Sequence, residues 1–203
     1  NEIKSLGITY QMHGLVLVDK NQKILRPSII WCDSRAVEIG DKAFDKIGED
    51  YCLKHFLNSP GNFTASKLRW VKEHEPEIFD KIDKIMLPGD FLAMKLTGEI
   101  STTVSGLSEG IFWDFTSNAI SDKLLNYYEI PDNIIPQVNP TFSNQGKILS
   151  SVAEVLGISS DAIVSYRAGD QPNNAFSLNV LNAGEVAANA GTSGVVYGVI
   201  DKN

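Results

Sequence analysis

Apolar residues come in short groups whose spacing changes repeatedly from strand-like alternation to helix-like periodicity, and this mixture limits the fold class. The longest uninterrupted apolar runs contain only a few residues, such as residues 15–18. A membrane-spanning helix needs about 20 apolar residues, so the sequence predicts none. Of 203 residues, 43% are hydrophobic and 21% charged. This composition excludes a disordered tail, a collagen-like repeat and a coiled coil.

The predicted elements alternate along the chain. Three strands near the start are expected to form a small antiparallel meander, at residues 2–10, 15–18 and 29–31. Further strands are expected at residues 85–87, 162–166, 186–190 and 195–200. Helices are expected at residues 33–47, 64–75, 76–79, 91–96, 121–128, 152–156 and 172–181. The Ser/Thr-rich residues 101–108 are predicted to be a polar loop. This order predicts an α/β fold with an antiparallel hairpin at each end.

The charge balance and the cysteines bear on partners and location. The chain has 18 basic and 25 acidic residues, a formal net charge of −7, and no basic stripe of the kind that binds nucleic acid. An anionic protein that binds phosphate must use backbone amides or a metal ion. Cys32 and Cys52 form no CxxC motif, so we expect free thiols in a reducing cytoplasm. Because the chain opens with Asn1 and is strand-like at once, we expect an excerpt of a longer protein.

The segment Gly169-Asp170-Gln171-Pro172 places an aspartate where a predicted strand ends and a helix begins. In open α/β sheets the carboxyl ends of the strands face the ligand crevice. Asp170 is therefore a candidate general base that accepts a proton from a substrate hydroxyl. The alternative is that Asp170 only caps the helix.

The segment Ala190-Gly191-Thr192-Ser193-Gly194 lies between two predicted strands. Two glycines on either side of two hydroxyls allow such a turn to present amides and hydroxyls to a phosphate. The alternative is an ordinary glycine hairpin. The segment is not a P-loop, because no lysine follows the last glycine.

Two further segments carry polar groups at predicted strand ends. His13 in Gln11-Met12-His13-Gly14 is either a ligand-binding or a structural histidine, and the three histidines lack the spacing of a zinc site. Trp31 in Trp31-Cys32-Asp33-Ser34-Arg35 offers a flat face to a polyol. The alternative there is a core tryptophan beside an Asp–Arg surface pair.

Together these segments resemble the FGGY family of carbohydrate kinases, and within it the xylulokinase branch. The resemblance covers essentially the whole chain. In chain order the motifs are Gln11-Met12-His13-Gly14, Trp31-x-Asp33-x-Arg35, Phe63-Thr64-Ala65-Ser66-Lys67-Leu68-Arg69-Trp70, Leu87-Pro88-Gly89-Asp90-Phe91-Leu92, Leu96-Thr97-Gly98-Glu99, Ala168-Gly169-Asp170 and Ala190-Gly191-Thr192-Ser193-Gly194.

The resemblance implies a fold of two actin-like, ribonuclease H-like ATPase domains with sugar and ATP meeting between them. Residues 1–182 would form most of the N-terminal, sugar-binding domain. Residues 183–203 would begin the C-terminal, ATP-binding domain. The family's first phosphate motif and most of the second domain are not in the sequence, so we expect the isolated chain to be inactive.

The resemblance also implies roles for the site residues. Asp170 would be the catalytic base, ATP and Mg²⁺ the cofactors, with no metal ligand in this sequence. The ATP phosphates would contact Gly191, Thr192, Ser193 and Gly194. The sugar would contact Met12, His13, Trp31, Asn62 and Gln171.

The implied reaction is ATP-dependent phosphorylation of D-xylulose to D-xylulose 5-phosphate, with a homodimer as the expected assembly and no nucleic-acid or membrane partner. Met12 and His13 favour a ketopentose. Gln171, where many xylulokinases have asparagine, is shared with glycerol kinases, and Thr103 replaces a usual aspartate. Glycerol, gluconate and other ketoses stay open as substrates, and a non-catalytic sugar-binding relative is the alternative from another class.

Overall fold

The structure is a computed structural model, and it describes residues 2–190 and 194–201. Helices and strands alternate along it, as the sequence predicts. The helices are α1 (Val37–Ile47), α2 (Glu49–His55), α3 (Thr64–His74), α4 (Pro76–Phe79), α5 (Pro88–Thr97), α6 (Val104–Glu109), α7 (Asp122–Tyr128), η1 (Asp132–Ile134), α8 (Ser150–Leu156) and α9 (Asp170–Ser177). The strands are β1 (Ser5–Tyr10), β2 (Val16–Val18), β3 (Lys84–Met86), β4 (Ser101–Thr103), β5 (Trp113–Asp114), β6 (Ala119–Ile120), β7 (Gln137–Asn139), β8 (Ile163–Gly169), β9 (Val186–Ala190) and β10 (Gly194–Gly198).

Strands β1 and β8 pair with each other although they lie far apart in the sequence. The strands run parallel, and Tyr10 at the end of β1 lies opposite Gly169 at the end of β8. The residues that follow each strand therefore leave the sheet at the same edge. This register brings the segment that contains His13 beside Asp170, although more than 150 residues separate them along the chain.

The predicted N-terminal meander is only partly correct. β1 does not join it, because β1 pairs with β8. Leu15 bridges Ile29 in the antiparallel sense, while β2 pairs with β3 rather than with residues 29–31. The strand predicted at residues 29–31 is reduced to that one bridge, and Trp31 lies in a turn. The C-terminal hairpin is confirmed, because β9 and β10 pair in the antiparallel sense.

The predicted loop at residues 101–108 is wrong. These residues form β4 and α6, and the segment 101–103 is buried. The hydroxyls satisfy one another and the backbone: Thr103 Oγ1 accepts from the Gly106 N–H at 3.1 Å and lies 3.1 Å from Ser105 Oγ. A Ser/Thr-rich composition typical of a loop is therefore compatible with a buried strand and a capped helix.

Several predicted helix limits also shift. α1 begins at Val37 rather than near Asp33, whose carboxylate pairs with Arg35 instead. α5 begins at Pro88, because proline suits the first position of a helix. α9 covers Asp170–Ser177 rather than residues 172–181, and α2 was not predicted.

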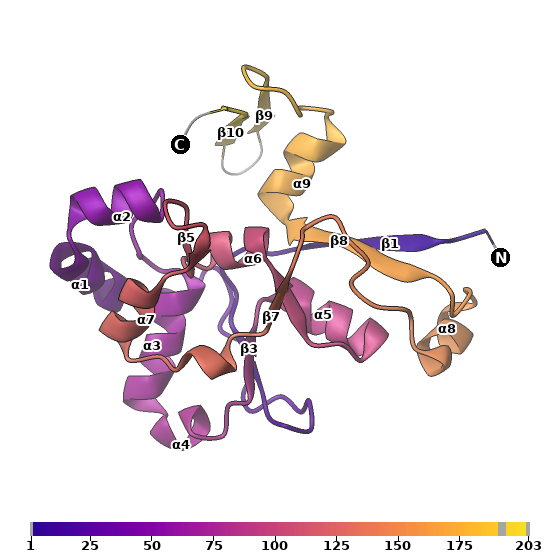
Figure 1. Ribbon diagram of the computed structural model, residues 1–203, viewed down its shortest axis with the longest axis horizontal. Coiled ribbons are helices and arrows are strands. Elements are labelled where there is room, and N and C mark those ends of the chain that lie inside the picture. Colours follow the sequence, from indigo (N-terminus) through magenta and orange to yellow (C-terminus); the bar gives the residue numbers. More distant parts are fainter. Residues whose placement is uncertain (1, 191–193, 202–203) are drawn as a thin grey trace.

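The apolar core divides into one large and two smaller clusters. The larger cluster lies among five helices and includes Leu68, Phe112 and Leu124. We call these helices, α1, α2, α3, α4 and α7, the helical lobe. A smaller cluster lies between the β1–β8 pair, α5 and α8. Figure 1 shows these two parts side by side, with α9 leading away from β8 to the β9–β10 hairpin. We call α9, β9, β10 and the residues between them the C-terminal arm.

None of the helices in the described ranges is long and apolar enough to cross a membrane.

Candidate active site

Asp170 is the first residue of α9, directly after the last residue of β8. In the described part of the chain, α9 has no side-chain hydrogen bond to its N-terminal amides, so the capping alternative for Asp170 is wrong. The only hydrogen bond that the structure shows for its carboxylate comes from Gln171 Nε2, 3.1 Å from Oδ2. The carboxylate instead lines a cavity.

Two cavities meet at Met12 and His13. The first, which we call the Asp170 cavity, has a volume of about 350 Å³. Its lining consists of Gln11, Met12, His13, Trp31, Asp170, Gln171 and Val195. The second, of about 390 Å³, lies beside α6 and also includes Ser105, Ser108, Glu109, Gly169 and Tyr197. The fold thus brings four of the predicted sugar-binding residues, Met12, His13, Trp31 and Gln171, to the same cavity as Asp170.

The turn at Gly169 is closely packed. A Cβ at this position would lie 2.3 Å from Met12 Cγ and 2.6 Å from Glu109 Oε2, so only glycine fits without a shift of its neighbours. Asn173 Nδ2 donates hydrogen bonds to the carbonyls of Ala168 and Gly169 at 2.8 and 2.9 Å. These contacts fix the peptide that precedes Asp170.

His13 has a defined orientation and protonation. Its φ of 61° is in the left-handed region, and its ring packs edge-on against Phe63, with 4.4 Å between centroids. Nδ1 lies 3.0 Å from the Glu109 carbonyl, which can only accept, so Nδ1 carries the proton. Burial lowers the pKa of the ring, which is therefore neutral at pH 7. A neutral ring with a proton on Nδ1 leaves Nε2 as a hydrogen-bond acceptor.

Lys67 of α3 ties together two segments of the site. Its side chain is fully buried, and Nζ donates to the carbonyls of His13 and Ile30 at 2.9 and 3.0 Å. The structure shows no carboxylate hydrogen-bonded to it among the described residues, and burial lowers its pKa to about 8. Lys67 therefore holds the backbone at His13 next to the backbone that leads into Trp31.

Trp31 lines the Asp170 cavity, whereas Asn62 lines neither of the two cavities. Trp31 is 60% exposed, so it is not a core residue, and its N–H donates to Gln11 Oε1 at 2.9 Å. Asn62 Nδ2 donates to the Asp33 carbonyl at 2.6 Å, whereas Asn62 Oδ1 is buried without a hydrogen-bond partner among the described residues. Such an atom is an unused acceptor.

The Asp33–Arg35 pair has a structural geometry. The two side chains form a two-pronged ion pair with distances of 2.8 and 2.7 Å, and Arg35 lies over the ring of Trp70, 4.5 Å from the centroid. The Arg35 guanidinium holds the pKa of Asp33 at about 2. Asp33 and Arg35 therefore form the Asp–Arg surface pair that the alternative predicted. The core tryptophan of the same alternative is wrong, because Trp31 is exposed.

The glycine-rich turn is described only in part. Gly191, Thr192 and Ser193 lie outside the described residues, so the structure does not test their prediction. Gly194 begins β10 opposite Ala190, and two residues of β10 reach the site, Val195 in the Asp170 cavity and Tyr197 in the second cavity. Within residues 2–190 and 194–201, no three His, Cys, Asp or Glu side chains are grouped in a way that suits a metal ion.

Sequence reasoning assigned no role to Lys67, Glu109 or Asn173. Lys67 had a signal, since it is the one charged residue in the first turn and a half of α3, where its neighbours are buried. Glu109 had none, because it follows the predicted loop at residues 101–108 and no helix was predicted there. Asn173 belongs to a helix whose start was predicted two residues too late.

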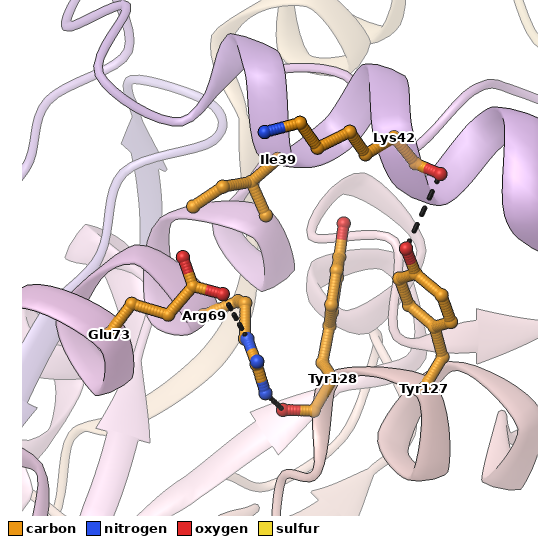
Figure 2. Close-up of a pocket in the computed structure, with 6 residues that line it drawn as sticks. All are labelled: Ile39, Lys42, Arg69, Glu73, Tyr127 and Tyr128. Carbon is orange, nitrogen blue, oxygen red and sulfur yellow. Dashed lines mark hydrogen bonds and ion pairs between the residues drawn. The ribbon is translucent and has the colours of Figure 1, made fainter.

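A separate pocket of about 240 Å³ lies between α1, α3 and α7 in the helical lobe (Figure 2). Its polar groups are paired internally: Arg69 donates to Glu73 at 2.7 Å and to the Tyr128 carbonyl at 2.7 Å, and Tyr127 donates to the Lys42 carbonyl. None of the predicted site residues lines it. We assign it no ligand.

The chain belongs to the FGGY family of carbohydrate kinases. The model of that family's N-terminal domain matches residues 1–177. The xylulose kinase of Escherichia coli K12 is 33% identical over 198 residues, which are 98% of this chain and 40% of that protein. The chain therefore spans about two-fifths of the curated relatives that it matches.

Solved structures agree with this assignment. The xylulose kinase of Rhodospirillum rubrum superposes with a TM-score of 0.84 at 27% identity, covering 94% of this chain and 40% of that one. The gluconate kinase of Lactobacillus acidophilus superposes with a TM-score of 0.88 at 22% identity, covering 97% and 40%. The predicted α/β fold of the actin-like ATPase type, with most of the N-terminal domain present, is confirmed.

Proposed function

We propose that the whole protein of which this chain is part transfers the γ-phosphate of ATP to D-xylulose and forms D-xylulose 5-phosphate. One observation carries the proposal: Asp170 is free of a capping role and lines the same cavity as Met12 and His13. The relatives named xylulose kinase favour this sugar.

Asp170 is the proposed base. It takes the proton from the terminal primary hydroxyl of the sugar while that oxygen attacks the γ-phosphorus. An O–H bond breaks, a bond between the sugar oxygen and phosphorus forms, and the bond from phosphorus to the ADP oxygen breaks. A base within hydrogen-bond reach contributes about 10²–10⁴-fold to the rate. Positioning and charge neutralisation supply the rest.

The proposed sugar contacts combine two acceptors and a flat ring. His13 Nε2 is an acceptor because Nδ1 carries the ring proton. Asn62 Oδ1 is a second acceptor without a protein partner in the described part of the chain. Trp31 is exposed at the rim, and Met12 and Gln171 complete the wall.

The proposed ATP contacts come from the turn that contains Gly191, Thr192, Ser193 and Gly194. The β9–β10 hairpin brings Val195 into the Asp170 cavity, which supports a phosphate position next to the base. Mg²⁺ would supply charge neutralisation for the phosphates, and the proposal assigns it no ligand among the described residues. The same proposal places residues 1–182 in one domain and residues 183–203 in a second. It also includes a homodimer and a cytoplasmic location.

Charge in the cavity argues against gluconate, the substrate of one structural neighbour. A sugar acid needs a cation for its carboxylate, and the lining of the Asp170 cavity includes no lysine or arginine. Nζ of the nearby Lys67 already donates to two backbone carbonyls. Glycerol remains the second candidate, because Gln171 is shared with glycerol kinases.

The test is ADP release by the whole protein with D-xylulose, D-ribulose, D-gluconate and glycerol in parallel. We expect the highest kcat/KM on D-xylulose. Asn62→Ala should raise KM for the sugar more than it lowers kcat, and Asn118→Ala in an exposed turn is the control. Highest turnover on glycerol or gluconate would make the assigned sugar wrong. Sugar binding without ADP release from any substrate would leave a sugar-binding relative.

A further inference from the structure

Glu109, the last residue of α6, touches both halves of the candidate site. Its backbone carbonyl accepts the hydrogen bond from His13 Nδ1 at 3.0 Å. Its carboxyl packs against the Gly169 turn, where Oε2 lies 2.6 Å from the position that a Cβ on Gly169 would take. One residue therefore contacts the proposed sugar-binding histidine and the turn that carries the proposed base.

The carboxyl of Glu109 is buried, and one of its oxygens is unused. The residue is 8% exposed, and Oε1 has no hydrogen-bond partner among the described residues. The hydroxyl of Tyr10, on the neighbouring strand β1, is also buried without a hydrogen bond of ordinary geometry in the described part of the chain. Burial raises the pKa of the Glu109 carboxyl more than the nearby Tyr10 hydroxyl lowers it. A buried carboxylate without donors is costly, whereas a neutral carboxylic acid is much less so.

The surrounding charges make the cost of an ionised carboxyl higher still. The negative charges of two other acids, Asp90 on α5 and Asp170 on α9, raise the pKa of Glu109 further. Arg167 on β8, the ion-pair partner of Asp90, directs its hydrogen bonds to Asp90, Gln145 and Ser101. The structure shows no hydrogen bond from a lysine or arginine to Glu109 within the described ranges.

We propose that Glu109 is a positioning residue of this active site, and that its side chain works as a neutral carboxylic acid that holds the Gly169–Asp170 turn in place, while its backbone carbonyl orients the His13 ring. The inference rests on the proposed kinase function. It assigns Glu109 no contact with the reacting atoms.

The protonation of Glu109 gives the inference a measurable consequence. Burial, followed by the charge of Asp90, raises its pKa to about 9. Ionisation above that pH would place a second negative charge beside Asp170 and push the turn away from it. The other groups that face this region are Tyr10, whose pKa burial raises, His13, whose pKa burial lowers, and the Asp90–Arg167 ion pair. Lys67, with a pKa of about 8, lies on the other side of His13.

The first test compares Glu109→Gln, Glu109→Ala and the exposed control Glu154→Gln in the whole protein, with D-xylulose and ATP from pH 6 to 10. Glutamine copies the shape and neutrality of the protonated acid. We expect kcat/KM of the wild type to decline near pH 9. We expect Glu109→Gln to keep kcat and KM near the wild-type values at pH 7.5 and to lack this decline. Glu109→Ala should lower kcat/KM about tenfold to a hundredfold, mostly through kcat, because the turn is displaced.

A second readout does not depend on catalysis. The folded-state pKa of Glu109 lies above its unfolded value of 4.5, so its contribution to stability is present below pH 4.5 and is lost as the pH rises toward 9. Glu109→Gln lacks this loss. Its melting temperature should therefore rise relative to the wild type by several degrees between pH 5 and 9, while Glu154→Gln follows the wild type.

The outcomes separate the two proposals. A Glu109→Gln variant as impaired as Glu109→Ala at pH 7.5, or one that keeps the alkaline decline, would overturn the neutral-acid role. A melting-temperature difference that does not change with pH would overturn it as well. If the wild type phosphorylates none of the sugars, the proposed function fails, and the melting comparison still decides the charge of Glu109.

Discussion

The helical lobe and the C-terminal arm differ in how their side chains are held. Apolar residues of the lobe are buried in one large core, and Leu68 and Leu124 are fully enclosed. In the arm, Leu178, Val186 and Val196 are between 60% and 75% exposed. The arm nevertheless carries Asp170. Polar contacts at the end of β8, rather than a core, must therefore position the proposed base.

Two helix starts, those of α7 and α9, can be compared in the same way, although α7 is the only helix of the lobe with a side-chain cap among the described residues. α7 in the lobe is capped by Ser121, whose hydroxyl accepts from the Leu124 N–H at 3.3 Å. α9 in the arm has no such cap among the described residues, and an aspartate occupies its first position. A carboxylate that satisfied helix amides would be a weaker base, so the missing cap leaves Asp170 available for chemistry.

The largest stability effect is expected at the buried ion pair beneath the site. Arg167 and Asp90 are both nearly inaccessible and lie 2.8 Å apart. Arg167→Met would leave a buried carboxylate without its partner and should cost about 3–5 kcal/mol in urea unfolding of the 203-residue chain. Lys147→Met, which removes an exposed pair with Asp161, should cost less than about 0.5 kcal/mol. Equal costs would show that burial does not separate the two pairs.

A matched pair of leucines tests the packing difference directly. Leu68→Ala in the lobe should lower the free energy of unfolding by about 2–5 kcal/mol, because it opens a cavity in a closed core. Leu178→Ala in the arm removes the same atoms from a side chain that is 60% exposed and should cost less than about 0.5 kcal/mol. Denaturant midpoints of both variants measure this. A large loss at Leu178 would mean that the arm has a core of its own.

The smallest expected difference concerns the serines of the two helices. Ser121→Ala removes the cap of α7 and should cost about 1 kcal/mol, measured by urea unfolding. Ser177→Ala at the end of α9 loses only an exposed hydrogen bond to the Asn174 carbonyl, and we expect no more than about 0.5 kcal/mol. If Ser177→Ala proved the costlier variant, the arm would depend on its helix termini more than the lobe does.

The spacing of residues along the sequence predicted most helices and strands. It could not predict which strands pair or which polar side chains meet in the interior. Apolar periodicity placed α3, the capping residue Ser121 marked the start of α7, and the αL glycine Gly98 correctly marked the end of α5. The partner of β1 could not be predicted, because β8 follows more than 150 residues later. The prediction of a loop at the Ser/Thr-rich residues 101–108 was wrong. Hydroxyls usually favour loops, but here they pair with one another in the interior.

The residues of the candidate site likewise fall into a group that the sequence predicted and a group that it did not. Asp170, Met12, His13, Trp31 and Gln171 were predicted as site residues, and the structure brings them to one cavity. The order of short motifs carried that prediction, together with the family resemblance. Lys67 and Glu109 were not assigned, because their roles depend on burial and on contacts between α3, α6 and the strand ends. The position of Lys67 in α3 is unusual in the sequence itself, but the contacts of Lys67 and Glu109 become visible only when the fold is known.

The most direct test of the central claim is Asp170→Asn in the whole protein, with ADP release and D-xylulose binding measured on the same samples. Asparagine keeps the size of the side chain and removes the base. We predict that turnover falls by about 10²–10⁴-fold while the dissociation constant for the sugar stays near the wild-type value. Turnover at the wild-type rate would contradict Asp170 as the base, and the reaction would have to take the sugar's proton elsewhere.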